Sequence, residues 1–326
     1  MDVTPGETPQ EVAAEKKRPP MLIDVFKRLI KEKPLGVVGG IIVLILLFAG
    51  SFADVLAPYG FNELDMAARL DGPSPDHILG CDNLGRDLLS RVIFGARISM
   101  FVGFGVTIFS TIGGVLIGIV SGYVGGKFDL IMQRFVDAWM ALPGLFILLS
   151  MIAVLGPGLV QVIIVLGVRQ SISESRIIRG AVIGIKENVY VEAARAIGVP
   201  TISILWRHLL PNIFAAILIL FTGHISSAIM MESTMSFLGF GIPPPMPSWG
   251  GMLSGAGRRY MILAPWLAFW PGLALAAVVY GANMFGDALR DLLDPRLRGG
   301  IGRYGGVTQE KLLKMVEDRK AKLKAA

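Results

Sequence analysis

Long runs without a charged residue alternate with shorter charged segments along most of this chain. Residues 34–53, 98–126 and 260–286 contain no Asp, Glu, Lys or Arg. Each run reaches the roughly 20 residues that an α-helix needs to cross the ~30 Å hydrocarbon core of a membrane. These three runs therefore predict three membrane-spanning helices.

A fourth uncharged run, residues 138–168, is too long for one span and too short for two. The triplet Gly156-Pro157-Gly158 in its middle favours a turn. The run therefore predicts parts of two spans, at about 130–154 and 158–177, joined by that turn.

This division places Asp137 and Arg169, which bound the uncharged run, inside the predicted spans. Asp137 and Arg169 fall near the cytoplasmic ends of those spans, where burial in the bundle or snorkelling makes a charge tolerable. Residues 211–237 form a further span, with His224 and Glu232 within it or near its end. The pattern as a whole predicts an all-α integral membrane protein with six transmembrane helices.

The distribution of basic residues sets the orientation of these spans. The first 34 residues carry seven Lys or Arg, and the tail from Asp287 carries ten. Since basic residues gather on the cytoplasmic side, both termini are expected inside. The loops at 54–97 and 239–259 are then external, and the loop at 171–210 is cytoplasmic. Within the first tail, Met21–Lys33 predicts either an amphipathic helix on the membrane surface or a continuation of the first span.

The same reasoning divides the chain into four parts. They are a cytoplasmic tail with its amphipathic helix (1–34), the first span with its external loop (35–96), a main transmembrane domain with a cytoplasmic loop at 176–211 (97–292), and a basic cytoplasmic tail (293–326). Inside the second span, Gly114, Gly118 and Gly122 recur every four residues. That spacing is typical of close helix packing in lipid.

Composition and motifs exclude several classes of function. The chain is 53% hydrophobic and 17% charged, which argues against two soluble domains. Its net charge of +6 gathers at the ends that flank the membrane, so nucleic acid is not an expected partner. A lone Cys81 rules out an internal disulfide and a Cys-based zinc cluster, and the three widely spaced histidines predict no metal site.

No nucleotide site is visible in the sequence. The nearest approach to a phosphate loop is residues 122–128, but Ser121 replaces the first glycine and Phe128 replaces the required Ser or Thr. A secondary, ion-coupled transporter is the main alternative, because such carriers place acids in mid-span. Asp137 and Glu232 are the candidates for that role, and both fall near predicted helix ends.

The cytoplasmic stretch 191–212, VEAARAIGVPTISILWRHLLPN, has its own pattern. Its alanines favour a helix, which Gly198 and Pro200 then break. A second amphipathic run, Ile202–Leu210, follows and is expected to stop at Pro211. The pattern predicts a helix, a sharp turn and a short helix between two spans, a shape that suits docking to a partner.

This stretch resembles the EAA loop of ABC-importer permeases. The matching residues are Glu192, Ala193, Ala194, Gly198 and the pair Leu210-Pro211. His208, where the general pattern has an aliphatic residue, resembles the peptide-permease branch. Residues 77–100, 236–253 and 285–299 are similar to motifs of the dipeptide/oligopeptide/nickel permeases of the DppC/OppC type. Three features depart from that pattern: Cys81 replaces a usual threonine, Ser171 replaces a common tryptophan, and the basic tail is longer.

The resemblance implies a type I ABC-importer permease fold in the cytoplasmic membrane of a bacterium or archaeon. It also implies a homologous second permease of the DppB/OppB type, two ATPase subunits and an extracytoplasmic substrate-binding protein. ATP and Mg would belong to the ATPase subunits, so this chain would hold no cofactor and catalyse no hydrolysis.

The resemblance also assigns candidate site residues. Coupling to the ATPase falls to Glu192, Ala193, Ala194, Gly198, Val199, Pro200, Leu205, Trp206, His208 and Pro211. The external loops supply candidates for gating or for contact with the binding protein, namely Asp82, Gly85, Arg86, Asp87, Arg91, Pro244, Trp249 and Gly250. For these loops the alternative is a folded cap that only closes the bundle. Asp137 and Glu232 either line the pathway or satisfy neighbouring helices, and helix packing is the preferred interpretation.

Overall fold

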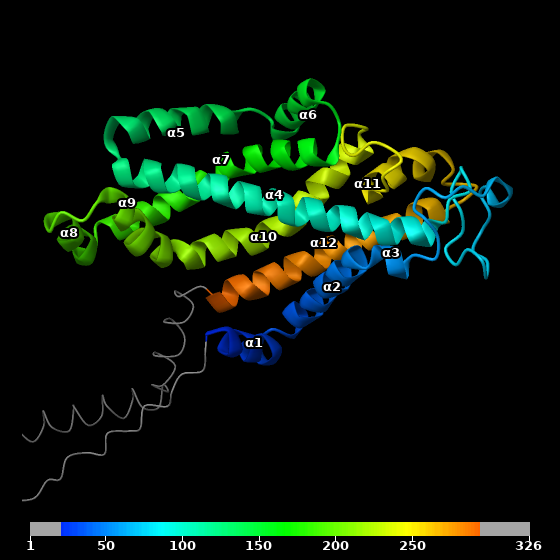
Figure 1. Cartoon of the computed structure of the whole chain (residues 1–326), viewed down its shortest axis with the longest axis horizontal. Coiled ribbons are helices and arrows are strands. Elements are labelled where there is room, and N and C mark those ends of the chain that lie inside the picture. The colour runs from blue at the N-terminus through cyan, green and yellow to red at the C-terminus, as the bar shows by residue number, and fades with distance from the viewer. Residues whose placement is uncertain (1–20, 294–326) are drawn as a thin grey trace, which may run out of the picture.

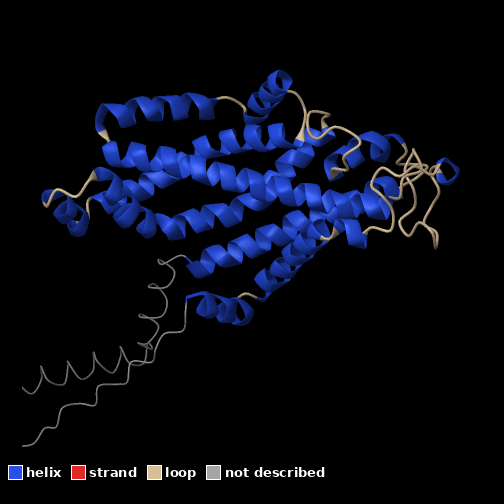
Figure 2. Cartoon of the chain, in the orientation of Figure 1, coloured by secondary structure: helices blue, strands red, loops and turns tan. Residues whose placement is uncertain are grey.

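The computed structural model describes residues 21–293, and this part of the chain is helical without a named strand (Figures 1 and 2). The predicted tails at 1–20 and 294–326 lie outside the described residues. The α-helices are α1 (Met21–Glu32), α2 (Pro34–Ser51), α3 (Ala53–Leu56), α4 (Leu88–Val124), α5 (Gly126–Ala141), α6 (Gly144–Leu155), α7 (Leu159–Lys186), α8 (Val189–Ala196), α9 (Thr201–Ile204), α10 (Leu210–Phe237), α11 (Trp249–Met252) and α12 (Trp266–Leu293).

The long helices lie side by side as one bundle (Figure 1). α4 packs along α7 and also contacts α10 and α2, while α12 packs between α2 and α10. Helices α8 and α9 lie at one end of the bundle, which we call the α8 end. The loops at 57–87 and 238–265 lie with α11 at the other end, which we call the loop end.

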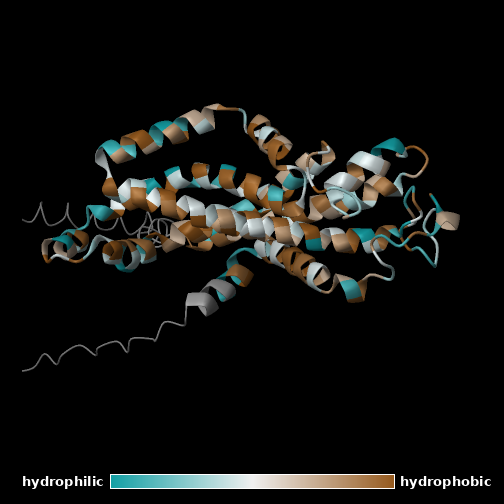
Figure 3. Cartoon of the chain, turned by 45° about the horizontal axis from the view of Figure 1, so that its top comes forward, coloured by the Kyte–Doolittle hydropathy of each residue, from teal (hydrophilic) through white to brown (hydrophobic). Residues whose placement is uncertain are grey.

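Four helical segments are long and apolar enough to cross a membrane: Pro34–Ser51, Leu88–Val124, Thr201–Phe237 and Trp266–Leu293. Counting the bent pair α5 and α6 as one span raises the number to five. Hydrophobic residues follow the long helices along their length (Figure 3). α7 also runs along α4 for 28 residues, but its charged residues keep it below the same hydropathy criterion.

The predicted span at about 130–154 is broken in the structure. Helices α5 and α6 meet at a 93° bend, with the break at Leu142 and Pro143. Leu142 adopts an extended backbone (φ −81°, ψ 140°), which is the conformation that a following proline imposes. The predicted turn at Gly156-Pro157-Gly158 is confirmed, because it separates α6 from α7.

Helix α4 begins at Leu88, ten residues before its uncharged run. The carboxylate of Asp87 caps it by accepting the Ser90 backbone N–H at 2.7 Å. The charged residue Arg97, in the first part of α4, has polar partners in the structure. Its guanidinium donates to the Gly50 carbonyl at 2.9 Å and pairs with Asp54 at 2.7 Å. Hydropathy alone assigned these residues to the loop, because these partners lie far away in sequence.

Two other predicted boundaries also differ from the structure. The short helix was expected to stop at Pro211, yet α9 continues into α10 through a π-helical turn at Leu205–Leu209. Pro211 follows this π-helical turn inside the continuous helical segment Thr201–Phe237, so it does not stop the helix. The predicted loop at 239–259 contains α11 and a second π-helical turn, Leu253–Gly257.

The N-terminal amphipathic helix is separate from the first span. α1 ends at Glu32, and α2 starts at Pro34. Leu29 packs with Ala288 and Leu292 of α12, and Lys33 pairs with Asp291 at 2.5 Å. α1 is therefore attached to the end of α12 and does not continue α2.

The three glycines of the predicted ridge lie along the contact between α4 and α7. A Cβ added to Gly118 would lie 2.7 Å from the Ile178 Cβ, and one added to Gly114 would lie 2.8 Å from the Glu174 Cβ. Gly122 faces Val182 at 3.0 Å in the same way. The absence of side chains at these positions lets the two helix backbones approach closely.

Candidate coupling segment and loop-end cavity

The segment at residues 189–209, here the α8–α9 segment, turns sharply at Gly198. Gly198 has a φ of +79°, a region that L side chains rarely adopt. The Val199 N–H donates to the Ala194 carbonyl at 3.0 Å, and the Gly198 N–H donates to the Arg195 carbonyl at 3.1 Å. These two bonds form a Schellman motif, which ends α8 and directs the chain into α9.

One face of the α8–α9 segment is anchored to the bundle. Val191, Ile204 and Leu209 are at most 1% exposed and share a core cluster with Ile178 and Val182 of α7. The Arg195 guanidinium lies 5.2 Å from the centre of the Tyr123 ring on α4. The segment is thus fixed to both α4 and α7, and a displacement of it would be passed directly to those helices.

The other face of the segment carries an apolar patch. Five large hydrophobic side chains are exposed here: Val189, Tyr190, Ile197, Ile202 and Trp206. Glu192 is also exposed and has no hydrogen bond or ion pair within the described chain. An exposed apolar patch beside an uncommitted carboxylate is typical of a protein interaction surface.

The predicted coupling residues divide between these two faces. Glu192, Ala193, Gly198, Pro200, Trp206 and Pro211 are exposed, whereas Ala194, Val199, Leu205 and His208 are buried or half-buried. Sequence reasoning missed Val189, Tyr190, Ile197 and Ile202 as members of the exposed face. The available signal was a set of large apolar residues inside an otherwise polar loop.

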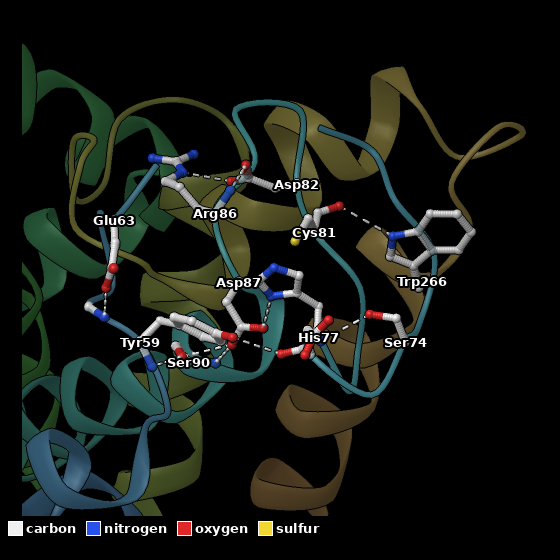
Figure 4. A network of polar contacts seen from close by, with 12 residues as sticks. Tyr59, Glu63, Ser74, His77, Cys81, Asp82, Arg86, Asp87, Ser90 and Trp266 are labelled. Atoms are coloured by element: carbon white, nitrogen blue, oxygen red, sulfur yellow. Dashed lines mark hydrogen bonds and ion pairs between the residues drawn. The ribbon is translucent and has the colours of Figure 1, made fainter. Parts of the chain in front are cut away.

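At the loop end, Asp82 organises a buried polar turn (Figure 4). Its carboxylate accepts the Leu84 N–H at 2.8 Å, the Arg86 N–H at 3.0 Å and the Arg86 Nε–H at 2.7 Å. It also forms an ion pair with Arg91 at 3.6 Å. All three charged residues are under 10% exposed, so they hold the loop together and offer little surface to a partner.

The neighbouring Asp87 joins the loop to α4. Besides capping the helix, its carboxylate accepts the Ser90 hydroxyl at 2.7 Å and lies 3.0 Å from His77 Nδ1 (Figure 4). Gly85 adopts a φ of +76°, and a Cβ there would overlap the Asp65 carbonyl oxygen. Within the described chain these contacts hold the loop against the start of α4, and the gating role of these residues stays a prediction.

Helix α11 closes the same end from the other side. The Trp249 Nε1–H donates to the Val92 carbonyl at 3.1 Å, and the indole covers Gly95 of α4. Gly250 lies against the Ser233 backbone so closely that a Cβ would overlap it. Neither contact leaves room for a Cβ, so both Gly95 and Gly250 must be glycine.

Between the loop and α11 lies a cavity of about 550 Å³. Asp82, Arg86, Arg91 and Pro244 line it, together with Ser248 and Arg259. Gly85, Asp87, Trp249 and Gly250 do not line it, and instead hold its walls in place. The cavity is large enough for a small solute.

Cys81 lies in this loop and is fully buried. Burial raises the pKa of its thiol to about 12, and the nearby Asp87 adds to the effect. Because only the thiolate reacts, a maleimide is expected to label Cys81 only after denaturation. Mass spectrometry of the labelled chain measures this. The control is a Cys81→Ser, Ile78→Cys variant, whose cysteine would replace a 61% exposed side chain. Equal native labelling rates for the two proteins would contradict the burial of the thiol.

The model of the "binding-protein-dependent transport system inner membrane component" family matches residues 114–299 of this chain. This chain belongs to that family. A second model, the "N-terminal TM domain of oligopeptide transport permease C", matches residues 21–73 of this permease. The second match covers α1 and α2, and the first covers the bundle from Gly114 in α4 to the end of α12. Both agree with the resemblance to the DppC/OppC type.

Individual relatives cover most of the permease. The dipeptide transport system permease protein DppC of Alkalihalophilus pseudofirmus is 36% identical over 84% of this chain and 90% of its own. The glutathione transport system permease protein GsiD of Pectobacterium atrosepticum is 37% identical, over 84% and 91%. The oligopeptide transport system permease protein OppC of Bacillus subtilis is 36% identical, over 82% and 88%.

A solved structure has a similar fold. A chain of the inward-facing MetNI methionine ABC transporter superposes with a TM-score of 0.50 and 17% identity, over 63% of this permease and 96% of that chain. Family, fold and hydropathy together make this chain a multi-pass membrane protein, the permease component of an ABC importer. Importers of this family work with ATPase and substrate-binding components.

Both acids that the alternative carrier mechanism would need are engaged with neighbours. Asp137 of α5 pairs with Arg176 of α7 at 2.5 Å. Glu232 of α10 is fully buried and accepts hydrogen bonds from Ser236 at 2.6 Å and Ser233 at 3.3 Å. These contacts support the preferred interpretation, in which both residues satisfy neighbouring helices.

Proposed function

We propose that this chain forms half of the translocation pathway of an ATP-driven importer for peptides or related small solutes. The relatives that are named for dipeptide, oligopeptide and glutathione transport support that class of solute. A second permease of the DppB/OppB type forms the other half. Two ATPase subunits bind ATP and Mg, and a substrate-binding protein delivers the solute from outside.

In this proposal the chain has six spans, with α7 as one and the bent α5–α6 pair as another. The α8 end and both termini face the cytoplasm, in agreement with the basic residues of the two tails. The loop end faces outward. The chain is then divided into the four parts at 1–34, 35–96, 97–292 and 293–326, with ATPase coupling at 176–211.

The observation that carries the proposal is the apolar patch of the α8–α9 segment. Its hydrophobic side chains and Glu192 are exposed, while the opposite face of the same segment is buried against α4 and α7. A partner that binds the patch would therefore move α4 and α7 when its own conformation changes. Such a lever biases the bundle between two states according to the nucleotide on the partner.

Uptake into proteoliposomes that contain the complete importer tests this function. Alanyl-alanine and glutathione serve as labelled probes, with ATP inside or outside the vesicles. We expect uptake of a probe to require ATP together with the binding protein, and to persist when proton and sodium gradients are collapsed. Uptake by this chain alone, driven by a proton gradient, would instead establish a secondary carrier.

A further inference from the structure

Arg169 is a cation halfway along the bundle without an ion-pair partner among residues 21–293. It lies ten residues after the start of α7, or about 15 Å along the helix axis, which is half of a ~30 Å hydrocarbon core. On α10, His224 lies at the corresponding middle position, fourteen residues after Leu210. A charge at this depth is costly unless it faces water or a partner.

The nearby acids are already occupied. Glu174 Oε1 accepts the Ser110 hydroxyl at 2.9 Å and lies 2.9 Å from His224 Nδ1. Glu174 also lies five residues after Arg169, about 140° around the helix, where it faces Gly114 of α4. Asp137 pairs with Arg176 and Asp129 with Arg179, each at 2.5 Å. The carboxylates around α7 therefore leave Arg169 uncompensated.

A small cavity with a polar and an apolar wall adjoins Arg169. Arg169, Gln170, His224 and Ser227 line it, and its volume is about 50 Å³. That space holds roughly three water molecules, or one carboxylate group with part of its solvent. The Gln170 side chain contacts the His224 ring, so the polar wall is held in place between α7 and α10.

The start of α6 adds to the positive character of the site. The Arg169 guanidinium lies against Gly144, the first residue of α6, so closely that a Cβ there would overlap it. The N-terminus of a helix carries a partial positive charge, so it does not neutralise the arginine. Guanidinium and helix end together favour an anion.

We propose that Arg169 binds the carboxylate of the transported solute midway along the pathway. The inference rests on the importer function proposed above, because peptides and glutathione all carry such a group. A guanidinium fits a carboxylate with two parallel hydrogen bonds. Gln170 and His224 form the polar wall beside it, and Val106 and Met231 form the apolar wall.

Chemical modification of the wild-type importer tests this site without a substitution. Phenylglyoxal reacts with accessible arginines, and mass spectrometry measures the rate at Arg169. We expect alanyl-alanine at about ten times its dissociation constant to slow that rate about tenfold, because protection by a bound ligand grows with the ratio of its concentration to that constant. The carboxyl-terminal amide of alanyl-alanine should leave the rate unchanged. Arg176 lies on the same helix as Arg169 but pairs with Asp137 of α5, so it serves as the internal control and should show no difference.

Equal protection by the peptide and its amide, or no protection, would overturn the proposal. So would an Arg169 that reacts in the isolated chain and not in the assembled importer, since a carboxylate of the second permease would then be its partner. Protection by phosphatidylglycerol in place of the peptide would assign the site to lipid phosphate and likewise overturn it.

Transport by matched variants separates this site from the function itself. We expect Arg169→Gln to lower alanyl-alanine uptake about tenfold, Arg169→Lys to lower it less, and Arg97→Gln, at the exposed pair with Asp54, to leave it near wild type. Wild-type uptake in Arg169→Gln would reject the site while the importer function stands. Protection of Arg169 without any ATP-dependent uptake would reject the importer function while the anion site stands.

Discussion

Replacing Gly198 with valine is expected to lower transport at least tenfold while the protein still inserts into the membrane. The φ of +79° at this position is strained for any L residue and most of all for a β-branched one. The cost of about 1–2 kcal/mol or more favours a different turn between α8 and α9. The apolar patch would then lose its alignment with the partner. Uptake by the complete importer, normalised to the amount of chain in the membrane, measures the effect.

Two matched variants separate backbone conformation from side-chain size. Gly198→Asn adds a side chain of similar bulk but tolerates a positive φ, so it should retain most of the transport. Gly180→Val places the same valine on α7 at a position with no atom within 4 Å of the new Cβ, and should behave like the wild type. A Gly198→Asn variant as inactive as Gly198→Val would show that bulk, rather than conformation, is decisive at the partner surface.

Replacing Asp82 with alanine is expected to unfold the loop end. Its carboxylate holds Arg86 and Arg91, and both arginines are under 10% exposed. Removing it leaves two buried charges without their partner, at a cost of about 3–5 kcal/mol. For a protein of this size, that corresponds to a melting temperature lower by about 10 °C. Thermal unfolding in detergent measures the shift, and hydrogen exchange of residues 59–91 locates it.

The exposed ion pair between Asp54 and Arg97 provides the control. The Asp54 side chain is 72% exposed, so water screens this pair, and Asp54→Ala should leave the melting temperature within error of the wild type. Equal shifts for the two variants would contradict the structural role of the buried turn. A stable Asp82→Ala protein with lost transport would instead assign Asp82 to the pathway.

Hydropathy was sufficient to locate most of the long helices. Inside a membrane every backbone N–H and C=O must be hydrogen-bonded within the segment, so an uncharged run of about 20 residues forms a helix. For this reason α2 and α10 start and end within a few residues of the predicted runs. The turn at Gly156-Pro157-Gly158 was equally predictable, since glycine and proline act on the backbone locally.

The same local logic found the α8–α9 segment. Its alanines, Gly198 and Pro200 specify a helix, a turn with positive φ and a helix start without help from other elements. The sequence could not show that the second helix continues past Pro211 into α10. Proline is compatible both with a helix stop and with a first helical turn, and the choice depends on how the following span packs.

Contacts between residues that are distant in the sequence could not be predicted in this way. Trp249 covers Gly95, and Arg97 pairs with Asp54, but neither contact has a local signature. The charged start of α4 was therefore assigned to a loop, and α11 was missed. The 93° bend of α5 and α6 was missed because hydropathy records how apolar a segment is and carries no information on its direction.

By itself the sequence determined an all-helical membrane protein, its family resemblance and the sharp turn at Gly198. These properties depend on backbone chemistry and on residues adjacent in the chain. Only the tertiary structure decided which face of the α8–α9 segment is exposed, which carboxylates form ion pairs and which arginine of α7 has no acidic partner among residues 21–293. Arg169 and Arg176 look alike in the sequence. They differ because Asp137 lies 2.5 Å from Arg176, whereas Arg169 lies beside a small cavity and the positive end of α6.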